Sequence, residues 1–506
     1  MVMRNTKALK FVTMVIALAV LAGSFCFPSQ SVSIEASAAD VLYGDVNGNG
    51  SVDSLDAAQV LKYDAMMITL DSAALTRGDV SGDGSVNSLD AAQILKFDAG
   101  MIDSLDPNGS STPVDGPINY DNMKGVWVDQ FSAGSLFNNA GTQRSEESFR
   151  TLATKMVDNL SRDGFNTVIL QMRPNGDSLY PSEIYPPSPS VGVAYDGEFA
   201  YDPLEIFLEI AHAKNLSVHG WINPMRLMKT EQIVNVPTKY TLGEWYNDSE
   251  KNGTYIVAYD GYYYLNPAYP EARQLVIDGV MEMCENYDVD GVHFDDYFYA
   301  DINPESLNLA FDQKAYELYG NSAGTETNLT FRKDFRRQQV NTLVKDVYSA
   351  IHEYNDDLVF GISPAGNIST NTAGYLCADV RTWCSAPGYV DYICPQVYWS
   401  FDHPTYSSKF NNCVSAWANL CTSNSVKLYI GIPTYLASNS APSGSDVGWK
   451  NYDDNIARML DYVKLHNRSE GFIFFAYGNT YNLFTGGYAT NYSKEIDNYI
   501  GKIKEW

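Results

Sequence analysis

The stretch Asp290-Gly-Val-His-Phe-Asp-Asp-Tyr-Phe-Tyr299 joins a short apolar run to two adjacent carboxylates and three aromatic rings. A brief apolar run bounded by turn residues is typical of a buried strand in a parallel sheet. In such sheets the functional groups lie just beyond the carboxyl ends of the strands. Because side chains alternate along a strand, we expect His293 and Asp295 on one face and Phe294 and Asp296 on the other. On spacing alone, an acidic loop that caps the next helix fits equally well.

The surrounding chain favours the first interpretation, because seven more runs of the same kind occur downstream of Met123. The eight expected strands are Gly125–Val128, Thr167–Gln171, Ser217–Ile222, Gly291–Phe294, Leu358–Ile362, Tyr392–Gln396, Lys427–Ile432 and Gly471–Ala476. Helical patterns separate most of them, at Glu146–Arg162, Pro203–Lys214, Pro270–Tyr287, Phe331–Tyr354 and Asn455–Leu465. This alternation over 123–506 predicts an α/β fold, a (β/α)₈ TIM barrel with long loops. A doubly wound open sheet is the alternative.

Polar and aromatic residues gather where these strands end. The candidates for binding a substrate are Asp129, Arg173, Asn175, Asp177, Asn223, His293, Tyr297, Gln396, Tyr398 and Trp399. Amides, carboxylates and aromatic rings suit sugars, which present hydroxyls and apolar ring faces. His293 also fits a hydrogen-bonded residue inside the barrel, and Arg173 and Asp177 could form a structural ion pair.

Glycosidic cleavage needs two carboxyl groups, one protonated and one ionised. Asp295 is the first candidate, and Asp296, Asp177 and Asp129 are possible partners. The seventh strand is followed by Pro433-Thr-Tyr435, without the acid of a common retaining arrangement. The chain shows no Gly-rich phosphate loop, no Ser-His-Asp order and no cluster of His ligands, which disfavours phosphoryl-transfer, esterase and metallohydrolase chemistry.

Charge excludes a further class of partner. The chain has 34 Lys and Arg against 61 Asp and Glu, a formal net charge of -27. Phosphate binding needs a basic surface, so nucleic acid is not an expected partner.

The N-terminus has the features of a secretory signal peptide, expected to span residues 1–38. A basic start with Arg4, Lys7 and Lys10 precedes the apolar run 11–22, and Ala36-Ser-Ala38 fits a cleavage site. We expect simple secretion without a lipid anchor, and no membrane association after cleavage. The cysteines left after cleavage match no zinc pattern, and some of them can pair in a secreted chain; they are Cys284, Cys377, Cys384, Cys394, Cys413 and Cys421.

Residues 41–106 contain a duplication with a period of 34. Each copy places oxygen-bearing residues at the ligand positions of an EF-hand calcium loop, with Gly at the sharp turn. The expected calcium ligands are Asp45, Asn47, Asn49, Ser51 (main-chain carbonyl), Asp53 and Asp56 in the first copy, and Asp79, Ser81, Asp83, Ser85 (main-chain carbonyl), Asn87 and Asp90 in the second. Without a cation these carboxylates would repel one another, so calcium should be required for folding.

This segment resembles a type I dockerin, a small all-α module with two EF-hand-like loops. The resemblance implies two calcium ions and two near-symmetric faces for the cohesin of a scaffoldin. The positions that would contact cohesin are Ser54, Leu55, Leu61 and Lys62 in one copy, and Ser88, Leu89, Leu95 and Lys96 in the other. Residues 107–119 are rich in Pro, Gly and Ser and are expected to be a linker.

The rest of the chain resembles the glycosyl-hydrolase-like family 10. The motifs that carry the resemblance are Lys124-Gly-Val-Trp127, Gln171-Met-Arg-Pro-Asn-Gly-Asp-Ser-Leu-Tyr180, His219-Gly-Trp-Ile-Asn-Pro224, Tyr264-Leu-Asn-Pro267, the stretch 287–299, Phe360-Gly-Ile-Ser-Pro364 and Asp391-Tyr-Ile-Cys-Pro-Gln-Val-Tyr-Trp399. It implies a barrel that hydrolyses O-glycosidic bonds, with no cofactor expected there, and Asp295 and Asp296 fall on the family's most distinctive motif. The same run resembles the fourth strand of family 18 chitinases, but Tyr297 replaces their final Glu.

Together these features predict a secreted, cellulosome-type glycoside hydrolase that acts on a cell-wall polysaccharide, either peptidoglycan glycan strands or a plant glycan. The alternative is a non-catalytic carbohydrate-binding barrel carried by the dockerin.

Overall fold

The computed structural model describes residues 42–80, 85–98, 105, 116–300, 309–320, 329–372, 376–438, 444–466 and 468–506. The chain forms two compact units, Met1–Ser110 and Ser111–Trp506. The expected signal peptide, and Ser81 and Asp83 of the second calcium loop, lie outside the described residues. Within these ranges, no helix combines the length and apolarity needed to cross a membrane.

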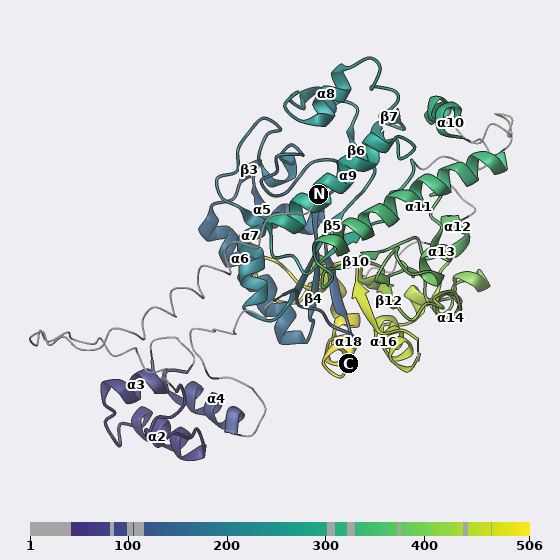
Figure 1. Ribbon diagram of the computed structural model, residues 1–506. Coiled ribbons are helices and arrows are strands. Elements are labelled where there is room, and N and C mark those ends of the chain that lie inside the picture. The colour runs from purple at the N-terminus through teal and green to yellow at the C-terminus, as the bar shows by residue number, and fades with distance from the viewer. Residues whose placement is uncertain are drawn as a thin grey trace, which may run out of the picture. The chain divides into compact units, whose positions relative to one another are not determined.

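The first unit is helical (Figure 1), with α2 (Ser54–Asp64), α3 (Ser72–Gly78) and α4 (Ser88–Asp98). The equivalent helices of the two repeats, α2 and α4, pack against each other. Aliphatic residues form the core, namely Val46, Ala57, Val60, Ala74, Val80, Ala91, Ile94 and Leu105. Helix α2 begins with a capping box, in which Asp53 and Asp56 each accept a hydrogen bond from the other end of the first turn.

The second unit is a closed barrel of eight parallel strands. In order around the ring they are β1 (Lys124–Val128), β13 (Gly471–Phe474), β12 (Lys427–Ile432), β11 (Tyr392–Ile393), β10 (Val359–Ile362), β9 (Gly291–Phe294), β5 (Ser217–Ile222) and β4 (Thr167–Arg173). The ring closes because β1 pairs in parallel with both β13 and β4. The predicted (β/α)₈ barrel is therefore confirmed, and the open sheet is excluded.

Helices surround the strands (Figure 1). The larger ones are α6 (Glu146–Asp163), α7 (Pro203–His212), α9 (Pro270–Asn286), α11 (Leu329–Tyr354), α14 (Phe410–Leu420), α16 (Asn455–Leu465) and α18 (Ser493–Lys504). Shorter ones include α5 (Gln130–Phe137), α8 (Thr241–Asn247), α10 (Gln313–Tyr319), α12 (Ile368–Thr372), α13 (Val380–Ser385), α15 (Gly448–Asn451) and α17 (Tyr477–Thr480). Helix α6 shows the local rules: Ser145 caps its first turn, and Gly164 ends it at φ 88.

The interior of the barrel is filled by hydrogen-bonded aromatic side chains. Nε2 of His293 accepts a hydrogen bond from Trp127 Nε1 at 3.2 Å, so its Nδ1–H donates to the Tyr392 hydroxyl at 2.8 Å. That hydroxyl lies 2.9 Å from Nδ1 of His219 and donates to it. Gly361 on β10 makes room for the Tyr392 ring, since a Cβ there would collide with it. The barrel is thus a packed core, which leaves its rim for function.

The segment between β5 and α9 forms a three-stranded antiparallel sheet that was not predicted from the sequence. Its strands are β6 (Arg226–Lys229), β8 (Tyr262–Leu265) and β7 (Ile256–Tyr259). The strands have only four residues each, too few for a period to be recognised. The sheet brings Arg226, Lys229 and Tyr262 to the carboxyl end of the barrel.

Candidate active site

A cavity of about 580 Å³ opens at the carboxyl ends of the barrel strands. Eight of the predicted site residues line it, namely Asp129, Asn175, Asn223, Asp295, Asp296, Tyr297, Gln396 and Tyr398. The rest of the wall is Trp127, Gln130, Phe131, Gln171, Ser190, Trp221, Arg226, Lys229, Gln232, Tyr262, Ser363, Tyr435 and Phe475. The structure therefore gathers side chains from at least six strand ends into one space.

Asp295 is the most constrained carboxylate of this cavity. It follows β9 directly, and its side chain is only 8% exposed. Its Oδ1 accepts hydrogen bonds from the main-chain N–H of Asp296 at 2.8 Å and from Gln396 Nε2 at 3.0 Å. Burial raises the pKa of Asp295, while the hydrogen bonds from Asp296 and Gln396 and the charge of Arg226 act in the opposite direction. A carboxyl group with a raised pKa can hold or release a proton closer to neutral pH.

Asp296 lies beside Asp295 and also lines the cavity. The side chains of the two acids hydrogen-bond to each other. Two carboxyl groups in such contact cannot both ionise at low cost. The strict alternation expected from a strand does not extend to Asp296, since β9 ends at Phe294 and the chain turns there.

Asp129 enters the cavity from the end of β1, three places around the ring from β9. Its Oδ1 accepts the main-chain N–H of Phe131 at 2.7 Å, which fixes the start of α5. Phe131 is 83% exposed and stands at the mouth of the cavity. An exposed ring in that position offers a stacking surface for a sugar.

Amide side chains hold the loops of the rim together. Gln171 accepts the main-chain N–H of Gln130 at 2.7 Å, and Asn175 Nδ2 donates to Gln130 Oε1 at 3.3 Å. Asn223 accepts from Trp221 Nε1 at 3.2 Å and donates to the carbonyl of Pro174 at 2.7 Å. These bonds orient polar groups toward the space that a substrate would fill.

Four predicted binding residues do not line the cavity. Arg173 lies outside the barrel wall, where its guanidinium packs 4.3 Å from the centre of the Tyr185 ring. The cause is a register shift in β4 between Gln171 and Arg173, which turns the arginine toward α9. Asp177 is buried below the rim and accepts the main-chain N–H of Asn175 at 3.0 Å.

His293 and Trp399 are the other two. His293 is fully buried beneath the cavity, and burial lowers its pKa, so it is neutral inside the barrel. Its Nε2 also accepts from Ser363 Oγ at 2.9 Å, and Ser363 in turn reaches the cavity. Trp399 packs over Gly366, where a Cβ would come within 2.8 Å of the indole ring.

Arg226 and Lys229 were not among the predicted site residues, yet they bring positive charge to the wall. The guanidinium of Arg226 lies 4.4 Å from the ring centre of Tyr262 and 4.9 Å from that of Tyr297. Its charge acts on Asp295 and Tyr297. Only the folding of the antiparallel sheet reveals this role, because β6 itself carries no recognisable motif.

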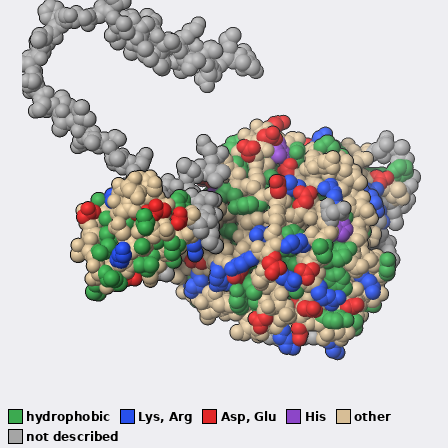
Figure 2. Space-filling view, turned by 90° about the horizontal axis from the view of Figure 1, so that it is seen from below, with side chains coloured by type: hydrophobic (Ala, Val, Ile, Leu, Met, Phe, Trp, Pro, Cys, Tyr) green, Lys and Arg blue, Asp and Glu red, His purple; other side chains and the backbone are tan. Residues whose placement is uncertain are grey.

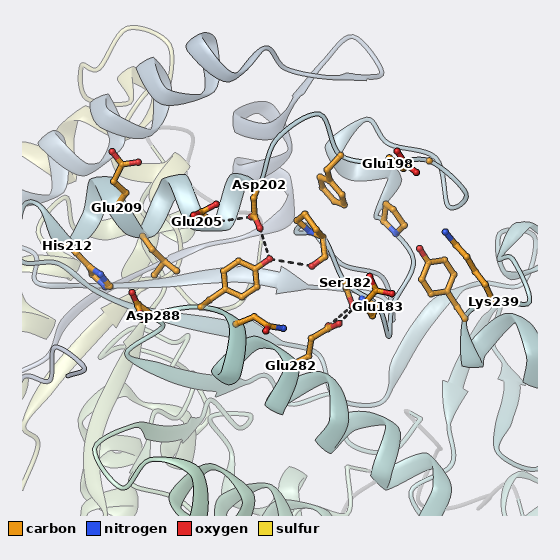
Figure 3. A pocket seen from close by; sticks show the side chains of 18 residues that line it. Ser182, Glu183, Glu198, Asp202, Glu205, Glu209, His212, Lys239, Glu282 and Asp288 are labelled. Atoms are coloured by element: carbon orange, nitrogen blue, oxygen red, sulfur yellow. Dashed lines mark hydrogen bonds between the residues drawn. The ribbon is translucent and has the colours of Figure 1, made fainter. Parts of the chain in front are cut away.

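A larger cavity, of about 900 Å³, lies beside α7 and α9 on the outside of the barrel (Figure 3). Its wall is acidic, but Glu282 already accepts from Ser182 Oγ, and Asp202 caps α7. His212 in this wall reaches Asp290, which precedes β9, so the cavity extends toward the amino end of that strand. The cavity at the carboxyl ends is therefore the better candidate.

In the first of the two repeated loops, aspartate side chains accept main-chain N–H groups. Asp45 accepts the main-chain N–H groups of Asn49 at 3.0 Å and Gly50 at 2.9 Å, and Asp56 accepts those of Asn47 at 2.9 Å and Asp53 at 3.0 Å. The carboxylates of Asp45 and Asp56 are buried, which calls for a compensating charge. In the described ranges no group of three or more His, Cys, Asp or Glu is arranged for a metal, so side-chain amides and carbonyl oxygens would have to complete the set.

Apolar side chains are exposed on the same unit, and Figure 2 shows hydrophobic side chains over much of its visible face. Leu55, Leu61 and Leu95 are 65%, 45% and 43% exposed. Lys62 and Lys96 stand in the last turns of α2 and α4, and Ser54 and Ser88 begin these helices. The side chain of Leu89 lies outside the described residues.

Fold and cavity define the class of the second unit, a glycoside-hydrolase-like TIM barrel whose acids lie at the carboxyl ends of the strands. Residues 122–450 match the family Glycosyl hydrolase-like 10, and residues 43–97 match the Dockerin type I domain. The chain therefore belongs to the glycosyl-hydrolase-like family 10 and carries a type I dockerin domain ahead of its barrel. Both resemblances are confirmed.

Two relatives are glycosyl hydrolases by name. Glycosyl hydrolase YngK of Bacillus subtilis (strain 168) is 32% identical over 326 residues, 61% of this chain and 61% of that protein. Glycosyl hydrolase DigH of Escherichia coli (strain K12) is 30% identical over 371 residues, 68% of this chain and 80% of that protein. Among solved structures, the glycoside hydrolase domain of PgaB (BpsB) from Bordetella bronchiseptica gives a TM-score of 0.48 at 10% identity, over 70% of this chain and 93% of that one.

Proposed function

We propose that the protein is an exported glycoside hydrolase that cleaves O-glycosidic bonds in a cell-wall polysaccharide, peptidoglycan glycan strands or a plant glycan. The observation that carries this proposal is the environment of Asp295. A buried carboxyl group with a raised pKa lies in a cavity walled by aromatic rings and amides. Such a wall binds sugar hydroxyls and ring faces, and such a carboxyl group serves acid–base or nucleophilic chemistry.

The chemistry needs two carboxyl groups on opposite sides of the bond that breaks. Asp295 and Asp296 hydrogen-bond to each other, so they act from one side of that bond. Asp296 is then the partner that orients Asp295 and opposes the effect of burial on its pKa. Asp129, at the end of β1 three places around the ring, is the carboxylate that we assign to the other side.

The other residues of the cavity wall would bind the sugar. Asn175, Asn223 and Gln396 offer amide groups to sugar hydroxyls, and Tyr297 and Tyr398 offer ring faces. Of the original candidates, Arg173, Asp177, His293 and Trp399 support the wall from outside the cavity. Arg226 and Phe131 join the proposed substrate-binding set.

Replacement of Asp295 by Asn tests the proposal. We expect hydrolysis of the right glycan to fall by about 10²–10⁴-fold, with the fold intact. New reducing ends released from peptidoglycan, chitin and plant glycans measure it. Asp278→Asn is the matched control, because that exposed side chain lies on α9, outside the cavity, and accepts a hydrogen bond from Gln274. Equal turnover by Asp295→Asn and the control would remove the assignment.

A non-catalytic sugar-binding barrel is the second candidate. One observation favours it: β12 is followed by Pro433, Thr434 and Tyr435, without a carboxylate. Binding of a glycan by the native protein, with no new reducing ends from any of the glycans offered, would decide for it.

The first unit would attach the enzyme to a scaffoldin. Asp45, Asn47, Asn49, Asp53 and Asp56 would hold one calcium ion, with the carbonyl of Ser51; the second loop would hold another. Calcium would supply the positive charge that the buried Asp45 and Asp56 need. The exposed Leu55, Leu61 and Leu95 fit an apolar contact with cohesin. Cleavage of the signal peptide would release the chain to the cell exterior, into a cellulosome.

A further inference from the structure

Two buried cysteines lie side by side in the barrel, although they are far apart in the sequence. Cys384 belongs to α13, and Cys421 caps the end of α14. The main-chain N–H groups of Thr422 and Ser423 both donate to the carbonyl of Cys384 at 3.2 Å. The chain around Cys421 is thus fastened to Cys384 itself. The thiol of Cys421 also hydrogen-bonds to the thiol of Cys384.

The other cysteines of this region have different surroundings. Cys413 donates its S–H to the carbonyl of Gly366 at 3.1 Å. Cys394 is buried in the barrel interior, among residues that include Tyr392 and Tyr429. The main-chain bonds to Cys384 and the interaction between the two thiols therefore single out this pair. A disulfide needs two cysteines held this close, with side chains that point at each other.

We propose that Cys384 and Cys421 form a disulfide in the exported protein. The inference depends on the extracellular location proposed above, where thiols meet oxidants, and is independent of the catalytic activity. The two thiols lose two protons and two electrons as the sulfur–sulfur bond forms. A small-molecule disulfide or a disulfide oxidoreductase accepts them and becomes two thiols.

The bond would enclose the part of the rim that positions Asp295. Between the two cysteines run β11, Gln396 and Tyr398. Gln396 donates to Asp295 and also to the carbonyl of Ser363 at 3.0 Å. A covalent link at the base of this segment holds its two ends together and limits its freedom in the unfolded chain.

The environment also indicates when the bond would form. The hydrogen bond from Cys421 and burial both raise the pKa of the Cys384 thiol. Disulfide exchange needs a thiolate and access to it, and the folded barrel provides neither. We therefore expect the bond to form during folding and then to resist reductants that do not unfold the protein.

Refolding the mature protein in a glutathione redox buffer tests the inference. After refolding, the protein is denatured and its free thiols are alkylated. We expect four alkylated cysteines, the six of the mature chain less the two in the bond. Fragmentation of the digested protein should give a peptide pair linked through Cys384 and Cys421. Protein recovered from the medium of an exporting host should show the same link.

Variants keep the test independent of folding yield. Cys384→Ser and Cys421→Ser should each remove the link and lower the barrel's unfolding temperature by about 5 °C under oxidising conditions. With reductant present during refolding, the difference should largely vanish. Cys413→Ser is the matched control and should keep the link.

Two results would overturn the inference. One is six alkylated cysteines in wild-type protein, both after oxidative refolding and from the medium. The other is a link that involves Cys394 or Cys413. Neither depends on glycan cleavage, so an inactive but linked protein would contradict only the proposed function.

Discussion

The two units of the molecule stabilise buried carboxylates in opposite ways. In the first calcium loop, Asp45 and Asp56 receive main-chain N–H groups from no more than 9 residues away. In the barrel, Asp295 accepts a hydrogen bond from the side chain of Gln396, 101 residues away. Asp312 accepts hydrogen bonds from Arg332 and Arg336, 20 and 24 residues away. A site built from neighbours in sequence can be recognised from spacing, whereas one assembled from distant strands needs the fold.

The difference extends to what holds each unit together. The dockerin core consists of a few aliphatic side chains, while the barrel has an extended core that includes many aromatic rings. Units with small cores need a metal or a cross-link. We therefore expect the stability of the dockerin to depend on a bound ion, and that of the barrel to depend on its buried ion pairs.

Removal of calcium should have the largest effect and should separate the two units. In the mature protein with a chelator, we expect the amides of residues 42–80 and 85–98 to lose protection from hydrogen exchange, because the buried Asp45 and Asp56 would lack a counter-charge. The barrel amides should be unaffected. Hydrogen-exchange mass spectrometry with and without calcium measures both units at once.

The control for this experiment is Asp56→Ala, which should show weak protection of the first loop and α2 even with calcium present. Full protection of the dockerin amides in chelator would mean that hydrogen bonds and the aliphatic core keep this unit folded without calcium. The two units would then not differ in their need for an ion.

Asp312→Asn should produce the next largest effect, now in the barrel. Asp312 is buried and accepts from Arg332 at 2.9 Å and from Arg336 at 2.7 Å. Loss of its charge leaves two buried guanidinium groups without a counter-ion, at a cost of about 3–5 kcal/mol in unfolding free energy. Urea unfolding followed by tryptophan fluorescence measures it.

Glu209→Gln provides the matched comparison, because its pair with Arg150 is exposed and should contribute less than about 1 kcal/mol. If both variants unfold at the same urea concentration, the buried pairs do not carry the stability that we assign to them.

The same distinction explains which features could be predicted from the sequence. The dockerin repeat and all eight strands follow from local spacing, and the position of Asp295 in the cavity follows from its place after an apolar run. Arg226 could not be found this way, because a sheet of short strands delivers it to the cavity. Arg173 is turned away from the cavity by a register shift in β4, which the sequence pattern does not predict. The role of Asp312 depends on α11, which follows it in the chain and carries both Arg332 and Arg336.

The buried histidines predict a pH dependence of the barrel. Burial lowers the pKa of His219 to about 4 in the folded barrel. In the unfolded chain the same imidazole is protonated near its ordinary pKa of 6.5. Stability from this group is complete above that value and is lost as the pH falls toward 4. We expect the loss to reach about 2 kcal/mol between pH 6.5 and 4.5.

Urea unfolding at several pH values measures this loss, and His219→Gln isolates it, since the variant should lose less stability on acidification than the wild type. Asp295 works in the other direction, because its raised pKa favours the folded state in acid. Parallel profiles for wild type and His219→Gln would contradict the assignment.

Gln396→Leu should have the smallest effect, and it tests the long-range contact itself. The hydrogen bond from Gln396 lowers the pKa of Asp295 against the larger effect of burial. Its loss should raise that pKa further and move the Asp295-dependent part of the pH–rate profile to higher pH. We expect kcat/KM at the original optimum to fall about tenfold. Gln274→Leu on α9, which removes only an exposed bond to Asp278, is the control. An unmoved profile would mean that Asp295 is tuned by its neighbour in sequence alone, as the carboxylates of the dockerin are.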